Sequence, residues 1–132
     1  MSARSKARKR ALDALYAAEL RGRPATEELD EFDGVVNEHT RTLVDGVVAH
    51  AARLDEIIAQ YSEGWTLDRM PAVDRNILRI GIFELLFVDD VPDAVAISEA
   101  VNLARELSTD DSAGFVNGIL GNVSRDRERL TS

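Results

Sequence analysis

The most constraining feature of the sequence is an apolar run from Ile77 to Val88, with the sequence ILRIGIFELLFV. Ten of its twelve residues are apolar or glycine, and only Arg79 and Glu84 are charged. A helix that is apolar nearly all round is buried on most sides, and twelve residues are too few to span a bilayer. The run therefore predicts a central buried helix, beginning near Asp74, around which the other segments pack.

Within this predicted helix, Glu84 lies among apolar residues. At about 100° per residue, Glu84 shares a side with Ile77, Ile80 and Phe87, whereas Arg79 lies on the other side. A buried carboxylate must be paired or hydrogen-bonded. We predict that Glu84 is satisfied inside the core and fixes a neighbouring helix, and the alternative is a contact with a ligand or a partner.

Charge is unevenly distributed along the chain. The net charge is −8, yet residues 1–10 carry five basic and no acidic residues, whereas the rest holds 11 basic and 24 acidic ones. A basic arm on an acidic body attracts phosphate locally and repels it elsewhere. This pattern favours a localised nucleic-acid contact, and a solvated, frayed terminus is the alternative. With no cysteine and no membrane-length or leader segment, we expect a cytoplasmic protein without disulfides.

Apolar residues recur at helical spacing through the rest of the chain. The expected helices cover residues 7–21, 26–32, 37–62, 94–107 and 113–130. We expect Asn37 to cap the third of these helices and the Asp110-Asp111-Ser112 stretch to cap the last. No alternating strand pattern appears, so the sequence predicts an all-α single domain of about seven helices over residues 1–132, with the basic arm at residues 1–10.

The structural roles of three further features depend on what packs against them. Gly114, Gly118 and Gly121 lie along the last helix, and small residues at such spacing allow a second helix to approach closely. Trp65 precedes the central helix, and we interpret it as a core or hinge anchor. Tyr16 follows the basic arm, where its spacing favours a core position over base stacking.

The sequence offers no catalytic or metal-binding constellation. His39 and His50 lie eleven residues apart on one expected helix, without a further His or Cys to complete a metal site. The stretch from Gly114 to Gly121 fits neither dinucleotide-binding nor phosphate-loop spacing. We therefore expect no enzyme activity, no metal and no cofactor, and the remaining class of function is binding.

Four segments resemble the NusB family of transcription antitermination factors. In order, they are KARKRALDALY at Lys6–Tyr16, DRNILRIGIFEL at Asp74–Leu85, DVPDAVAISEAVNLAREL at Asp90–Leu107 and FVNGIL at Phe115–Leu120. A fifth, WTLDRMPAVDR at Trp65–Arg75, is similar to the actinobacterial branch of the family. The order and spacing of the segments make the resemblance specific, and it covers nearly the whole chain.

The resemblance implies two packed helical subdomains and a function without catalysis. NusB-like proteins pair with a small-subunit ribosomal protein, called NusE in this role, and the two bind the boxA element of nascent single-stranded RNA. This complex makes RNA polymerase resistant to termination, notably on ribosomal RNA operons. A homodimer that uses the partner-binding surface is a further arrangement that the sequence allows.

The resemblance also implies positions for the contacts. RNA contacts are expected at Arg4, Lys6, Arg8, Lys9, Arg10, Tyr16, Asp111, Ser112 and Phe115. Contacts with the ribosomal protein are expected at Asp68 and Asp74. Because Ser5 and Ala7 interrupt the basic segment and Gly114 offers no extension of it, we expect weak RNA binding without the partner.

Three other interpretations stay open on the sequence alone. A similar helical domain begins certain ribosomal-RNA cytosine methyltransferases, but those carry a large methyl-donor-binding domain, and we expect this chain to be complete at Ser132. A protein-binding adaptor would use the basic arm for an acidic partner and show no RNA-specific signal. A DNA-binding helix-turn-helix protein is disfavoured, because the basic residues do not lie on a compact second helix.

Overall fold

The computed structural model describes residues 2–32 and 34–132, and within these residues the regular structure is entirely helical. The α-helices are α1 (Ala3–Arg21), α2 (Ala25–Asp30), α3 (Glu38–Ala49), α4 (Ala51–Tyr61), α5 (Ala72–Phe87), α6 (Asp93–Leu107), α7 (Asp110–Arg125) and α8 (Arg127–Thr131). A short 3-10 turn, η1 (Leu67–Arg69), precedes α5. The all-α prediction is confirmed. None of these helices combines the length and apolar character needed to cross a membrane.

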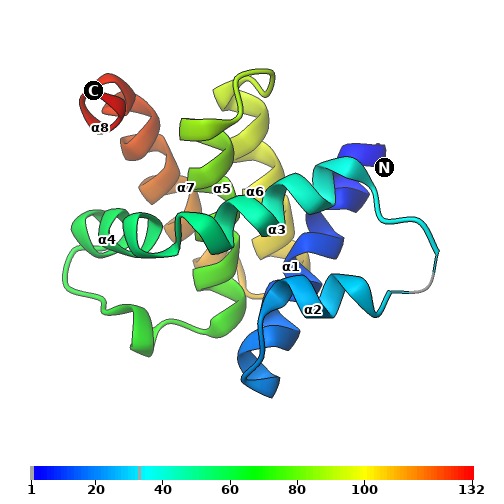
Figure 1. Cartoon of the computed structure of the whole chain (residues 1–132). Coiled ribbons are helices and arrows are strands. Elements are labelled where there is room, and N and C mark those ends of the chain that lie inside the picture. Colours follow the sequence, from blue (N-terminus) through cyan, green and yellow to red (C-terminus); the bar gives the residue numbers. More distant parts are fainter. Residues whose placement is uncertain (1, 33) are drawn as a thin grey trace.

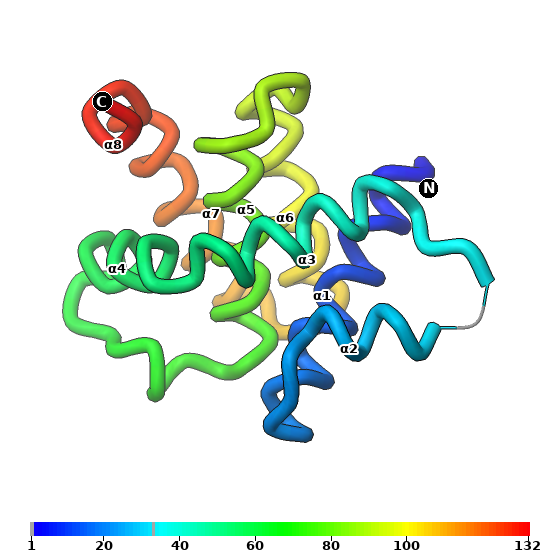
Figure 2. Tube along the Cα trace, in the orientation of Figure 1, coloured from blue at the N-terminus to red at the C-terminus, as the bar shows by residue number. Residues whose placement is uncertain are grey.

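The helices form two groups that meet at α5. One group contains α1, α2 and α3, which pack on one another, and the other contains α5, α6 and α7. Helix α5 also packs on α1 and α3, and it thereby joins the two groups. In Figure 1, α3 crosses in front of α5, and α4 continues away from it across the molecule. Figure 2 shows how the segment after α4 swings out before the chain returns to α5. This arrangement agrees with the two packed subdomains that the resemblance implies.

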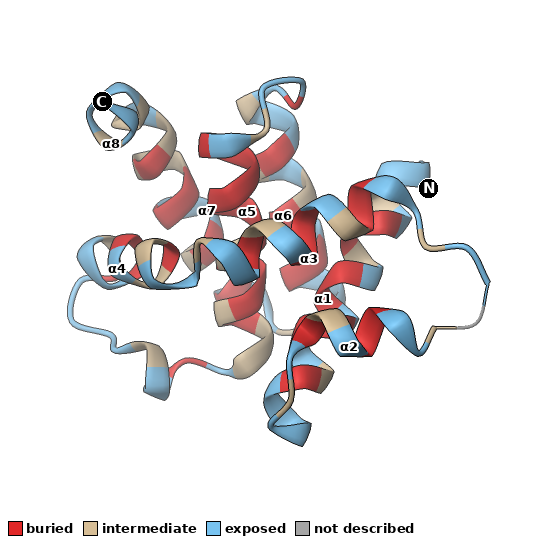
Figure 3. Ribbon diagram, viewed as in Figure 1, coloured by how far each residue is buried: buried red, intermediate tan, exposed pale blue. Residues whose placement is uncertain are grey.

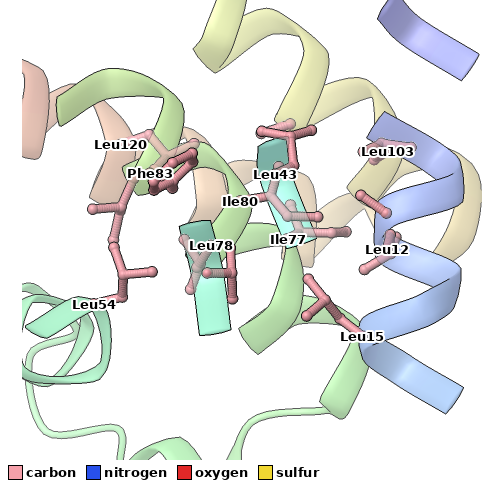
Figure 4. Close-up of a cluster of buried hydrophobic side chains, with 14 of the residues drawn as sticks. Leu12, Leu15, Leu43, Leu54, Ile77, Leu78, Ile80, Phe83, Leu103 and Leu120 are labelled. Carbon is pink, nitrogen blue, oxygen red and sulfur yellow. The ribbon is translucent and has the colours of Figure 1, made fainter. Parts of the chain in front are cut away.

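Helix α5 is the buried centre of the fold, as its sequence predicts. Its fully or almost fully enclosed apolar residues include Ile77, Leu78, Ile80, Ile82 and Leu85. Figure 3 shows the buried colour along most of the helix. In Figure 4, Leu12 and Leu15 of α1 face Ile77, while Leu120 of α7 lies beside Phe83. Each fully buried Leu or Ile contributes about 1.5–3 kcal/mol relative to an exposed one, so α5 supplies much of the core.

Glu84 is the charged residue at the centre of this core. Its Oε1 accepts a hydrogen bond from Arg8 Nε at 2.7 Å, and its Oε2 accepts from Arg8 Nη2 at 3.0 Å. His39 Nε2 lies 2.9 Å from the same Oε2. Arg8 is 3% exposed and Glu84 1% exposed. The prediction of a satisfied buried Glu84 is confirmed, and its partners hold α1 and α3 against α5.

Three expected helices have clearly different bounds in the structure, and the first of them begins at Ala3, four residues before its expected start. The helix expected over residues 37–62 is divided at His50, whose backbone (φ −108°, ψ 17°) leaves the helical region while its ring stacks on Phe87. The division lets α3 pack on α1 while α4 packs on α7. The last long helix begins at Asp110 and ends before Asp126, and its cap is Thr109, whose hydroxyl accepts from the Ser112 N–H at 2.9 Å.

Close helix approach occurs at glycines other than the predicted ones. A Cβ at Gly114, Gly118 or Gly121 would meet nothing within 4 Å, so the prediction of a second helix packed there is wrong for the part of the chain that the structure describes. A Cβ at Gly46 of α3 would instead collide with the ring of Phe83. This ring therefore occupies the space that a side chain at position 46 would need.

We expect Gly46→Ala to lower the free energy of unfolding by about 1–3 kcal/mol, because the added methyl group overpacks the core. Gly118→Ala is the matched control on an open helix face and should raise it by roughly 0.5–1 kcal/mol. Urea denaturation of both variants measures the difference. Equal responses would contradict the tight contact between α3 and α5.

The stability of the fold should depend on pH through Glu84. Burial alone raises the pKa of Glu84, but hydrogen bonds from His39 and Arg8 outweigh burial and hold this pKa below its usual value of 4.5. The ion pair therefore stabilises the fold above pH 4.5, and this contribution is lost as the pH falls through the lower folded-state pKa. Urea denaturation below pH 4.5 should show a shallower pH dependence in Glu84→Gln than in the unmodified chain. The same pH dependence in both proteins would argue against a lowered pKa.

Candidate nucleic-acid and partner interface

The basic arm is part of helix α1. Ser2 caps the helix, its hydroxyl accepting from the Ser5 N–H at 3.0 Å, and α1 begins at Ala3. Successive residues of a helix are turned by about 100°, so the five basic residues point in different directions. Lys6 and Arg10 are exposed, and Arg8 is buried.

Two of the basic residues form ion pairs at the surface. Arg4 Nη2 lies 2.9 Å from Asp90 Oδ2, and Lys9 Nζ lies 2.7 Å from Glu106 Oε1. All four side chains are substantially exposed. Exposed pairs contribute little, typically about 0–1 kcal/mol, so a phosphate group can replace either carboxylate at small cost.

Lys6 and Arg10 are the more available cations. Neither forms an ion pair within residues 2–32 and 34–132. The Arg10 guanidinium lies 4.9 Å from the centre of the Phe32 ring, an arrangement that favours a fixed orientation of the cation. Because they are four residues apart, Lys6 and Arg10 lie on one face of α1.

Arg8, which the resemblance assigns to RNA, does not join the other four basic residues at the surface. In addition to its two bonds with Glu84, its Nη1 donates to Glu99 Oε1 of α6 at 3.1 Å. The structure thus places this guanidinium among carboxylates of α5 and α6, enclosed by the core.

Tyr16 lies on the exposed side of α1. Its side chain is 36% exposed, so the interpretation of Tyr16 as a core residue is wrong. Tyr16 follows Lys9 by seven residues, which places the two on the same side of the helix about two turns apart. An aromatic ring and basic groups on one face match the chemistry of single-stranded nucleic-acid binding.

A groove forms where the segment before α5 meets the start of α7. Its volume is about 370 Å³ and its lining is mostly apolar. The lining residues are Trp65, Met70, Pro71, Asp74, Ser108, Thr109, Asp111, Ser112 and Phe115. We call this the Trp65–Phe115 groove. Trp65 is 56% exposed, so of the two interpretations, core or hinge anchor, the core position is wrong.

Asp74 forms the polar floor of the Trp65–Phe115 groove. It is 4% exposed, and its Oδ2 accepts a hydrogen bond from Ser112 Oγ at 2.7 Å. Its Oδ1 has no hydrogen-bond partner among the residues that the structure describes. A buried acceptor without a partner costs about 1–3 kcal/mol, so the groove floor carries an unsatisfied carboxylate oxygen.

The groove collects residues that the resemblance assigns to two ligands. Asp111, Ser112 and Phe115 are predicted RNA contacts, and Asp74 is a predicted protein contact, yet all four line this groove. Asp68 lies outside it, exposed on η1. The sequence did not assign Trp65 to the site. The only local signal was the short apolar connection in front of α5.

Comparison with known proteins places the chain in a family. The model of the NusB family matches residues 5–125. The chain belongs to the NusB family. A relative from Nocardioides sp., the transcription antitermination protein NusB, is 60% identical over 98% of this chain and 99% of its own length. The predicted resemblance is therefore confirmed.

Solved NusB structures share this fold. NusB of T. maritima has a TM-score of 0.88 and 32% identity over 98% of this chain and 96% of its own. A crystal structure of the antitermination factors NusB and NusE in complex with dsRNA contains a chain with a TM-score of 0.77 and 29% identity, over 92% of this chain and 96% of that one. The NusB fold thus extends over nearly the whole chain.

Substitutions of Asp74 and Ser112, which are hydrogen-bonded to each other on the groove floor, test how the site affects the stability of the fold. Asp74→Asn keeps an oxygen for Ser112 but puts an NH2 group without a described acceptor in place of Oδ1, so we expect it to lower the free energy of unfolding by about 1–3 kcal/mol. Ser112→Ala leaves the carboxylate without its donor and should lower the free energy of unfolding by a similar amount. Urea denaturation at neutral pH measures both variants. Unchanged stability in both would show that the hydrogen bond between Ser112 and Asp74 contributes little.

Proposed function

We propose that this chain is a transcription antitermination factor that binds boxA single-stranded RNA together with a small-subunit ribosomal protein acting as NusE. The complex supports transcription of ribosomal RNA by RNA polymerase in the cytoplasm, and the chain acts by binding, without catalysis. Its membership of the NusB family carries this proposal. The NusB chain bound to NusE and dsRNA supports it, since 92% of this chain aligns with that fold.

The exposed face of α1 is the proposed RNA-binding surface. Lys6 and Arg10 offer cations without ion-pair partners among the described residues, and Lys9 exchanges its surface carboxylate for phosphate. Arg4 lies one turn before Arg8, on another side of the helix, and contributes a further exposed cation at the N-terminal end. Tyr16 offers a ring for one base, and such stacking is worth about 1–3 kcal/mol. Since the body of the protein is acidic, attraction for phosphate is strongest at this face.

The Trp65–Phe115 groove is the proposed meeting point of RNA and partner. Phe115 offers a further ring for a base, beside Asp111 and Ser112. Asp74 lines the groove and Asp68 lies on η1 in the segment before α5, and these two carboxylates are the proposed contacts with the ribosomal protein. A shared groove would favour binding of the RNA and the ribosomal protein together. Each would cover part of the apolar surface that the other leaves exposed.

Fluorescence anisotropy of labelled RNA tests this function. The chain is titrated into boxA RNA and into a scrambled RNA of equal length, with and without the ribosomal protein. Tighter binding to boxA that the partner strengthens is the expected result. Equal binding to both RNAs, unaffected by the partner, would overturn the proposal and favour a protein-binding adaptor.

Removing the available cations should reduce the salt dependence of RNA binding. Each phosphate contact on a single strand contributes about 0.7 to the slope of log K against log salt. We expect Lys6→Gln with Arg10→Gln to weaken binding and make the slope shallower by about 1.4. Arg53→Gln with Arg125→Gln is the matched control, because it removes the same charge from α4 and α7. An equal effect of both pairs would show that only net charge matters.

A further inference from the structure

Arg8 joins four helices at one buried point. From α1, its guanidinium donates to Glu84 of α5 and to Glu99 of α6, while Glu84 also contacts His39 of α3. One residue earlier, the carbonyl oxygen of Ala7 accepts a hydrogen bond from Thr40 Oγ1 of α3 at 3.0 Å. The second turn of α1 is therefore fixed both through a side chain and through the backbone.

Arg8 lies between Lys6 and Arg10 in the sequence, and its side chain points in the opposite direction to theirs. Residues two apart on a helix are turned by about 200°, so Lys6 and Arg10, which flank Arg8 at this distance, face away from the core. Helix ends have few internal hydrogen bonds and fray. The anchor at Arg8 lies in the second turn of α1, directly after the first turn that Ser2 caps. It fixes the helix from which both cations point outward, and the Phe32 ring also holds Arg10.

We propose that Arg8 is a positioning residue for RNA binding, which orients Lys6 and Arg10 through its buried ion pair with Glu84 and makes no contact with RNA itself. This inference rests on the proposed function. The bidentate pair and the enclosure of both side chains carry it. Glu84 occupies Arg8 Nε and Nη2, and Glu99 occupies Nη1, so a phosphate would have to displace a carboxylate that is already paired. Displacing Glu84 would leave a buried carboxylate with His39 as its one remaining described partner, which is unfavourable.

The test is the double variant Arg8→Met/Glu84→Gln. It removes one charge of each sign, so the net charge of the protein is unchanged, and the introduced amide keeps a hydrogen-bonding group near His39. We expect the affinity for boxA RNA to fall about tenfold, because ordering even one residue of α1 on binding costs that much. The slope of log K against log salt should stay the same, because every phosphate-binding side chain is still present.

The double variant Arg127→Met/Asp93→Asn is the control. Arg127 Nη1 lies 2.8 Å from Asp93 Oδ1, so this ion pair joins α8 to α6 and does not involve α1. We expect the control to lower stability without changing RNA affinity. All variants are compared at a temperature where circular dichroism shows them folded.

Arg8→Lys decides the question if the first double variant does not fold. Lysine keeps the charge but cannot form the two-pronged contact, so a positioning role predicts weaker binding with an unchanged salt slope. Unchanged affinity in the variants at position 8 would overturn the proposal. So would a slope shallower by about 0.7 in Arg8→Met/Glu84→Gln, because that variant removes the cation and such a change marks a direct phosphate contact. Failure of the proposed function is distinct, because then the unmodified chain would not prefer boxA RNA.

Discussion

The buried ion pair between Arg8 and Glu84 is the interaction on which the arrangement of the helices depends. Glu84 lies in a helix that is otherwise apolar on nearly all sides, and a carboxylate there is tolerated only with full compensation. Arg8 and His39 provide it from α1 and α3. The cost of leaving this charge unpaired selects one relative placement of three helices, whereas apolar contacts alone tolerate several.

That placement also shapes the surface. Because Arg8 is drawn inward, the basic segment presents a reduced set of cations, with Lys6 and Arg10 free of ion pairs among the described residues. The acidic residues of α6 then lie near α1, where Glu106 pairs with Lys9. The proposed RNA surface on α1 therefore has few strong contacts, in keeping with the proposal that RNA binds together with a protein partner.

The Trp65–Phe115 groove shows a different use of a buried carboxylate. Glu84 has partners for both oxygens, whereas Asp74 has a described partner for only one. Both residues belong to α5, so one helix carries a charge that organises the core and another that faces a groove. An incompletely satisfied buried acceptor is a cost to the stability of the fold.

The sequence by itself determined the helical class, the central position of α5 and the need for a partner of Glu84, because apolar periodicity and the cost of buried charge are local properties. The burial of Arg8 was not predicted, although Leu12 and Leu15 follow it at helical spacing. Its charge favoured an exposed position, and only the packing of α1 on α5 brings it to Glu84. The tertiary structure likewise decided the groove, because the contact between residues 74 and 112 spans 38 positions and depends on how α5 and α7 pack, which no local pattern encodes.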